Sequence, residues 1–161
     1  MEIKVRGYSG SDIPEMVRIW NLVVEKGMAF PQEDELSAEE AVTFFGSQSH
    51  CGVAELDGRV VGLYILHPNN VGRCGHISNA SYAVDPSMCN KGIGAALVED
   101  SLSTAASLGF RIMQFNAVVQ ENASAIHLYE KKGFKRIGMV PGGFRSKDGE
   151  YRTIILFYHE L

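Results

Sequence analysis

Cysteine is scarce in this sequence, and long apolar runs and clusters of basic residues are missing. The three cysteines, Cys51, Cys74 and Cys89, are odd in number and form no Cys-x-x-Cys pair, so we expect reduced thiols and no zinc site. No apolar stretch is long enough to cross a membrane, and the N-terminal residues lack the apolar core of a signal peptide. These absences predict a cytoplasmic protein without a membrane partner.

The charge distribution also limits the partners of the chain. The formal net charge is −4, and lysine and arginine form neither a long run nor a stripe along a helix. Because phosphate neutralisation dominates nucleic-acid binding, nucleic acid is not expected as the main partner, although a local patch could hold a small anionic cofactor. The five histidines are scattered along the chain, which predicts no metal site.

Length and composition predict a single domain over residues 1–161. Hydrophobic residues make up 45% and charged residues 21% of the chain, an ordinary balance for a globular protein. A chain of 161 residues fits one core better than two. The oligomeric state stays open at this point, with a homodimer as one option.

Local signals mark the ends of the expected helices and strands. Ser37 and Glu40 form a capping box, Asp57-Gly58 suits the tight turn of a β-hairpin, and Asn122 can cap a helix. The resulting order, β-α-α-β-β-β-α-β-α-β-β, indicates a mixed α/β domain. Strands are expected at residues 3–7, 51–56, 59–66, 76–84, 112–119, 134–140 and 151–158, helices from about residues 12, 37, 92 and 122, and a polar loop at 142–149.

The strongest functional signal is the turn that leads from the strand ending at Val84 into the helix beginning at Gly92. A helix N-terminus exposes unpaired N–H groups with a partial positive charge. The small residues Gly92, Gly94 and Ala95 would let a pyrophosphate approach this backbone. The alternative is an ordinary helix start whose glycines permit tight packing. Neither a P-loop Gly-Lys-Ser/Thr nor the third glycine of a dinucleotide fold is present.

Two motifs make the chain resemble the GCN5-related N-acetyltransferase (GNAT) superfamily. The acetyl-CoA signature of that family, Arg/Gln-x-x-Gly-x-Gly/Ala, corresponds to Cys-Asn-Lys-Gly-Ile-Gly at residues 89–94. A second family motif, Asn-x-x-Ala-x-x-Leu-Tyr-x-x-x-Gly-Phe, corresponds to residues 122–134. The motifs stand in the order found in the family, and the likeness extends from about residue 3 to the C-terminus.

The resemblance implies an α/β (α+β) fold with a mixed, mostly antiparallel sheet and helices on both faces. It also implies acetyl-CoA as the co-substrate and no metal. Cys89 departs from the family pattern because it replaces Arg or Gln, so one side-chain contact to the cofactor is lost and weaker binding is expected. The implied cofactor-binding residues are Ala83, Val84, Cys89, Asn90, Lys91, Gly92, Ile93, Gly94, Ala95, Asn122 and Tyr129.

A narrower likeness, carried by residues 75–82 and 113–119, is to the branch that includes fungal N-acetyltransferases acting on proline analogues. The resemblance implies a small-molecule amine as acceptor, with an amino or imino acid as the favoured class. It assigns the substrate to Asn79, Tyr82 and Asn116, and it gives catalytic roles to Tyr129, Asn122 and Asn116.

Several of these residues also have a structural interpretation. The amides in the two central strands, Asn79, Gln114 and Asn116, either satisfy one another across the sheet or line a cleft, because a buried amide without a partner costs ~1–3 kcal/mol. Asn122 can cap its helix and also bond the cofactor. Tyr129 is either a core tyrosine or, as the resemblance implies, the general acid that protonates the leaving thiolate.

The expected reaction is direct attack of a neutral amine on the acetyl thioester, with both substrates bound together. A backbone N–H near Val84 would face the acetyl oxygen. Residues 79–83 contain no Asp or Glu, so the base would be a water, or the amine would bind already deprotonated. Two alternatives remain: a non-catalytic acetyl-CoA-binding sensor, and a protein-lysine acetyltransferase, which the lack of a recognisable acidic groove disfavours.

Overall fold

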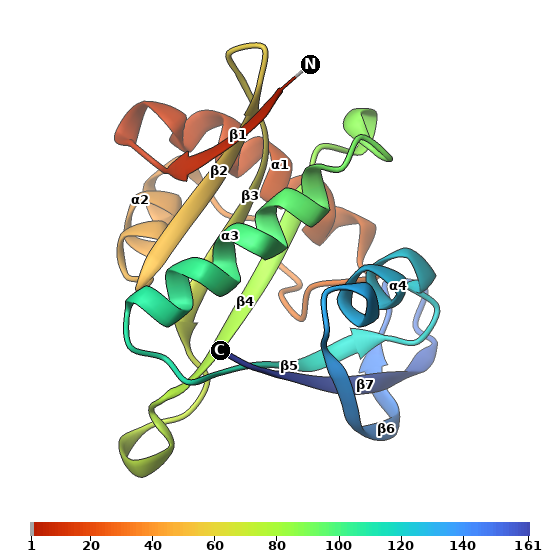
Figure 1. The fold of residues 1–161 in the computed structure, drawn as a ribbon. Helices are drawn as coiled ribbons and strands as arrows, with labels where there is room; N and C mark the ends of the chain where they lie inside the picture. The colour runs from red at the N-terminus through yellow and green to blue at the C-terminus, as the bar shows by residue number, and fades with distance from the viewer. Residues whose placement is uncertain (1) are drawn as a thin grey trace.

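A seven-stranded sheet forms the centre of the molecule in the computed structural model, which describes residues 2–161. The strands lie in the order β1-β2-β3-β4-β5-β7-β6, and every neighbouring pair is antiparallel except β4 and β5, which are parallel. The mixed, mostly antiparallel sheet expected from the sequence is therefore confirmed (Figure 1). The strands are β1 (Ile3–Gly7), β2 (His50–Leu56), β3 (Arg59–Pro68), β4 (Ile77–Val84), β5 (Ile112–Val119), β6 (Lys135–Arg145) and β7 (Tyr151–Glu160).

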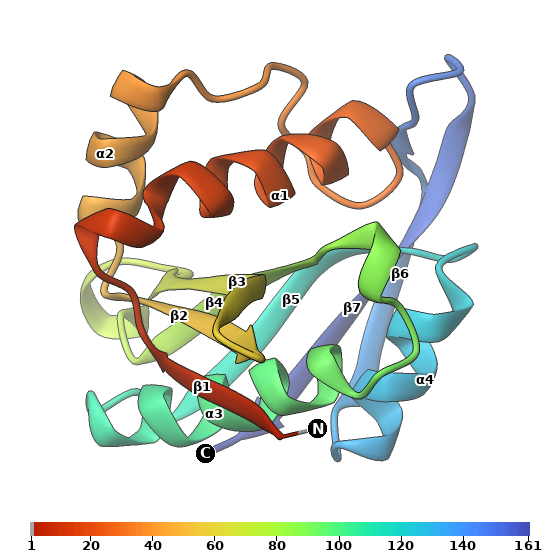
Figure 2. The same ribbon diagram turned by 90° about the horizontal axis from the view of Figure 1, so that it is seen from above.

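Helices cover both faces of this sheet, as Figure 2 shows. The first face carries α1 (Ile13–Lys26) and α2 (Ala38–Gly46), and the second carries α3 (Ile93–Ser107) and α4 (Ala123–Lys131). Each layer has its own apolar core. The core under α1 and α2 includes Trp20, Phe45 and Leu63, and the core under α3 and α4 includes Leu97, Phe115 and Phe157.

Most of the local signals fold as expected. Ser37 and Glu40 form the capping box of α2, and the β2–β3 turn uses positive φ angles at Asp57 and Gly58. The end of the chain differs: β6 continues through Gly142 and Gly143 to Arg145, so the connecting loop covers residues 146–150 rather than 142–149. A register irregularity between Val140 and Phe144 accommodates these glycines, which lets the strand keep its partner β7 beyond them.

Gly62 in β3 determines how closely α3 can approach the sheet. A Cβ atom at this position would lie 3.0 to 3.1 Å from side-chain atoms of Ile93 and Leu97 and from the carbonyl oxygen of Ala83. A side chain here would force its neighbours to move apart by a few tenths of an ångström. The first turn of α3 is thereby held directly against the ends of β3 and β4.

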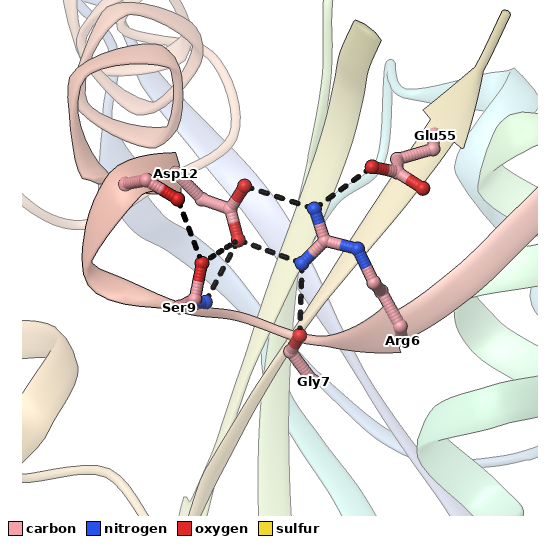
Figure 3. Close-up of polar contacts among 6 residues, drawn as sticks. Arg6, Gly7, Ser9, Asp12 and Glu55 are labelled. Carbon is pink, nitrogen blue, oxygen red and sulfur yellow. Dashed lines mark hydrogen bonds and ion pairs between the residues drawn. The ribbon is translucent and has the colours of Figure 1, made fainter. Parts of the chain in front are cut away.

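A charged cluster ties the first strand to the start of α1 (Figure 3). Arg6 donates to both carboxylate oxygens of Asp12, at 2.7 and 2.9 Å, and to Glu55 on β2 at 2.8 Å. Asp12 is 7% exposed and also accepts the backbone N–H of Ser9. Hydrogen bonding by the Arg6 guanidinium lowers the pKa of Asp12 from 3.8 to about 2.

This cluster predicts an acid-sensitive contribution to stability. Because the pKa of Asp12 is lower in the folded state, its pairing stabilises the fold above pH 4 and loses its effect as the pH falls toward 2. We expect Arg6→Met to lower the free energy of unfolding by about 2 kcal/mol at pH 7, and the deficit should shrink between pH 4 and pH 2.5. Denaturant titrations at several pH values, with Arg73→Met as an exposed control, measure this. A deficit that does not change with pH would contradict it.

Candidate active site

The two parallel strands separate soon after they begin, which opens the sheet between β4 and β5. They pair at Ile77 with Ile112 and at Ser78 with Met113, and no further pair follows within residues 2–161. The Asp85 N–H donates to Val61 on β3, so the alternating backbone groups of Ala80, Tyr82 and Val84 point toward β5 instead. Past Ser78 these groups have no strand to pair with. The opening thus offers free backbone donors and acceptors along β4.

The turn after β4 forms a backbone cradle at the end of this opening. Asn90 and Gly92 adopt positive φ angles of 62° and 80°, and α3 begins at Ile93. The first N–H groups of α3 lack helical partners, and residues 89–92 are exposed. Alternation of left-handed residues at a helix start produces a concave set of N–H donors, which favours a bound anion.

The two site residues expected at α4, Asn122 and Tyr129, lie on the same side of the opening as α3. Asn122 is the N-cap, where its side-chain oxygen accepts the Ala125 N–H at 3.4 Å. The Tyr129 ring packs among aromatic rings, with centroid distances of 4.6 Å to Phe115 and 5.7 Å to Phe134. Within residues 2–161 the Tyr129 hydroxyl has no hydrogen-bond partner. It also keeps some solvent exposure, because it is not among the fully buried polar atoms without a partner. Tyr129 is thus fixed by its ring and free at its hydroxyl.

Burial raises the pKa of Tyr129 above the ordinary tyrosine value. The hydroxyl therefore stays protonated at neutral pH. A protonated, unpartnered hydroxyl beside the opening can donate a proton to a group that enters it.

The amides of the central strands do bond to one another. Asn79 donates to the backbone oxygen of Gln114 at 2.8 Å, which continues the β4–β5 contact by one side chain beyond the backbone pairs. Gln114 donates to Asn116 at 2.9 Å, and Asn116 donates to Asn69 in the β3–β4 loop at 2.6 Å. The structure thus brings Asn79 and Asn116 into one polar row at the narrow end of the opening.

Tyr82 does not join this row. Strand alternation places it on the face of α3 and α4, where its hydroxyl bonds Ser101 at 2.7 Å and its ring lies 5.8 Å from that of Phe115. Asn79 faces the opposite layer, because the neighbouring odd-numbered residue Ala83 packs under α1. The predicted grouping of Tyr82 with Asn79 and Asn116 is therefore not what the fold produces.

A cavity of about 890 Å³ lies beyond the end of α1. Two of its lining residues, Val24 and Phe30, belong to the core cluster that includes Ala83 of β4, and Phe144 belongs to the cluster that includes Val119 of β5. The sequence did not indicate this cavity, since its walls come from the α1–α2 connection and the β6–β7 end. Its charged lining residues are Glu25, Glu33, Glu35, Arg145 and Lys147.

Two contacts join the opposite walls of the cavity. Arg145 forms an ion pair with Glu33, and the backbone N–H of Lys147 donates to the carbonyl of Gly27 at 3.2 Å. The Lys147 ammonium has no ion-pair partner within residues 2–161. The cavity therefore combines one unpaired cation with the carboxylates of Glu25 and Glu35.

Comparison with known proteins identifies the family. A profile of the acetyltransferase (GNAT) family matches residues 16–134. The chain belongs to the GNAT family.

Relatives over nearly the full length agree with this assignment. N-acetyltransferase aca1 of Schizosaccharomyces pombe is 29% identical over 158 residues, covering 86% of this chain and 76% of that protein. A GCN5-related N-acetyltransferase from Kribbella flavida superposes with a TM-score of 0.91 at 31% identity, over 99% of this chain and 98% of that one. A Sinorhizobium meliloti phosphinothricin acetyltransferase in complex with acetyl-CoA superposes with a TM-score of 0.92 at 22% identity, over 100% of this chain and 89% of that one.

The residues of the GNAT signature fit a pyrophosphate. Residues 89–92 are exposed, and Gly94 and Ala95 add no side chain that would fill the cradle. Cys89 supplies no charge there, so a bound pyrophosphate would depend on backbone N–H groups and the dipole of α3. Residues 2–161 contain no group of His, Cys, Asp and Glu side chains that could hold a metal ion. No helix in the described part of the chain is long and apolar enough to span a membrane.

Proposed function

We propose that this GNAT acetyltransferase, acting as one domain over residues 1–161, transfers the acetyl group of acetyl-CoA to the amine of a small molecule in a ternary complex. One observation carries the proposal. Strand β4 runs along the opening and leads into the anion cradle, and the Tyr129 ring lies 6.2 Å from that of Tyr82 on β4 and 4.6 Å from that of Phe115 on β5, so we take these three features as one route.

Acetyl-CoA has three parts that match this route. Its pyrophosphate would bind the N–H groups of residues 90–95 at the start of α3. The amide groups of its extended arm would lie along free backbone groups at the end of β4, in place of the missing β5 ladder. When bound, it supplies an activated acyl group to the end of the opening.

Three groups of the chain would act on the reacting atoms. The Val84 N–H would donate to the acetyl oxygen as negative charge develops there. Tyr129 would give its proton to the departing sulfur. Asn122, whose side-chain nitrogen bonds no described residue, would donate at the N-terminus of α4, where negative charge is stabilised.

We take the cavity beyond the end of α1 as the acceptor site, and its charges support an acceptor class. Arg145 is neutralised by Glu33, which leaves Lys147 as the cation and Glu25 and Glu35 as anions. This combination suits a zwitterion, such as an amino or imino acid, whose carboxylate binds Lys147. The Sinorhizobium neighbour is named a phosphinothricin acetyltransferase, an enzyme named for a small molecule. Asn79 and Asn116 would act as additional polar contacts beside the opening, whereas Tyr82 would serve the core.

A panel of acceptors tests this proposal. Thiol release from acetyl-CoA is measured with amino acids, imino acids including proline analogues, their methyl esters, and polyamines. We expect turnover of the free acids and weaker activity with the esters. Lys147→Gln should raise KM for the acids on the order of 10-fold, the effect of losing one charged contact, without changing acetyl-CoA affinity. Lys135→Gln, an exposed lysine of β6, is the matched control.

The outcomes separate the alternative functions. Good turnover of polyamines with no turnover of amino acids would show that Glu25 and Glu35, rather than Lys147, select the acceptor. Acetylation of lysine in peptides alone would favour a protein acetyltransferase. Acetyl-CoA binding without thiol release for any amine would indicate a non-catalytic sensor module.

A further inference from the structure

A buried carboxylate stands at the start of the connection that leads from β4 to the anion cradle. Asp85 directly follows β4 and is 3% exposed. One carboxylate oxygen accepts the backbone N–H and the hydroxyl of Ser87, at 2.9 and 2.8 Å. The backbone N–H and carbonyl of Asp85 are also used, by Val61 and Met88. Asp85 therefore fixes the shape of the first part of the turn.

Arg18 on α1 occupies the second oxygen of this carboxylate. Its guanidinium donates to Asp85 at 2.7 Å and also pairs with Glu15 one turn earlier in the helix. Although burial raises the pKa of Asp85, the hydrogen bonds from Arg18 and Ser87 outweigh it and hold the pKa at about 2. The carboxylate is therefore charged at neutral pH.

A negative charge at this place opposes the binding of a pyrophosphate. Repulsion between anions is weakly screened when one of them is buried, and Asp85 belongs to the same short connection as the cradle at residues 90–94. Burying a carboxylate without a partner would also be costly. Asp85 is bonded to Ser87 within the turn, and the charged partner of its carboxylate, Arg18, comes from outside the turn.

We propose that Arg18 is a positioning residue for acetyl-CoA: it neutralises Asp85 and holds the cradle in the shape that accepts the pyrophosphate. The inference rests on the proposed function, because it takes acetyl-CoA as the ligand of the turn. It also assigns α1 a second role. The helix that ends at the acceptor cavity is bonded at its middle to the cofactor turn.

Calorimetric titration with coenzyme A at pH 8 tests this assignment. Arg18→Met leaves Asp85 uncompensated and should weaken binding about 10-fold, as expected for one uncompensated buried charge. Arg18→Lys keeps the charge and should bind nearly as the wild type does. The double variant Arg18→Met/Asp85→Asn removes both charges but keeps an oxygen for Ser87, and it should recover most of the lost affinity.

Recovery in the double variant distinguishes charge compensation from mere anchoring of α1. If Arg18 only anchored α1, removing the Asp85 charge as well would not restore the affinity. Arg59→Met, an exposed arginine without an ion pair in the described chain, controls for net charge, and thermal melts confirm that each variant folds. Unchanged affinity in Arg18→Met, or a double variant as weak as the single one, would overturn the assignment. A wild type that binds no coenzyme A would overturn the proposed function as well.

Discussion

Tyr129→Phe is expected to lower kcat by roughly 10²–10⁴-fold, the range for loss of a general acid. Coenzyme A affinity should stay the same, because the ring keeps its packing against Phe115 and Phe134. The hydroxyl removed has no hydrogen-bond partner among residues 2–161, so the fold loses no internal bond. Steady-state kinetics at saturating acetyl-CoA, together with calorimetry, separates the two effects.

The pH profile gives a second readout of the same residue. Burial raises the pKa of Tyr129 above the ordinary value of 10.0, so the wild-type kcat should not fall from tyrosine ionisation up to that pH. Tyr158→Phe on β7 serves as the control, because strand alternation places its side chain on the opposite face of the sheet from Phe157 and Tyr129. Full kcat in Tyr129→Phe would make Tyr129 a packing residue and leave the thiolate to take its proton from water.

Features encoded by a few adjacent residues could be predicted from the sequence. The capping box at Ser37 and the Asp57-Gly58 turn each depend on contacts within four residues, and the left-handed positions at Asn90 and Gly92 lie inside one short motif. Such signals survive without tertiary context because the physical cause is local.

The cavity beyond the end of α1 could not be predicted in this way. It forms where the end of α1 meets the β6–β7 loop, and Glu33 and Arg145 become partners only after the sheet is assembled. The strand boundary of β6 was missed for a related reason. Gly142 and Gly143 favour a turn locally, and Gly142 does adopt a positive φ of 67°, but pairing with β7 resumes at Phe144 and carries the strand on to Arg145.

The position of Tyr82 could have been predicted from strand alternation, but the family resemblance was given more weight. Alternation along β4 places even and odd residues on opposite faces, so the sequence already separated Tyr82 from Asn79. The family resemblance grouped them, and the bond from Tyr82 to Ser101 shows which layer it joins. For the amides the choice was open, and Asn79, Gln114 and Asn116 satisfy part of one another's hydrogen-bonding capacity while remaining beside the opening.

Gly94→Glu is expected to weaken acetyl-CoA binding on the order of 100-fold while the fold survives. A Cβ at this position would lie 3.4 Å from the nearest atom, a methyl carbon of Leu128, so a side chain can be accommodated with a slight adjustment. A carboxylate near the N-terminus of α3 even favours the helix through its dipole. Against a pyrophosphate about 5 Å away, the same charge costs ~3 kcal/mol at an effective dielectric constant of about 20, which corresponds to a loss on the order of 100-fold.

Two neutral substitutions separate charge from bulk. Gly94→Ala adds only the Cβ and should bind acetyl-CoA nearly as the wild type does, with a gain in helix propensity of about 1 kcal/mol. Gly94→Gln has the size of glutamate, so the difference in affinity between Gly94→Gln and Gly94→Glu isolates the repulsion. That difference should decrease at high salt, because ions screen exposed charges. Equal affinity in the Glu and Gln variants would place the pyrophosphate away from the start of α3, and the assignment of this turn would have to be withdrawn.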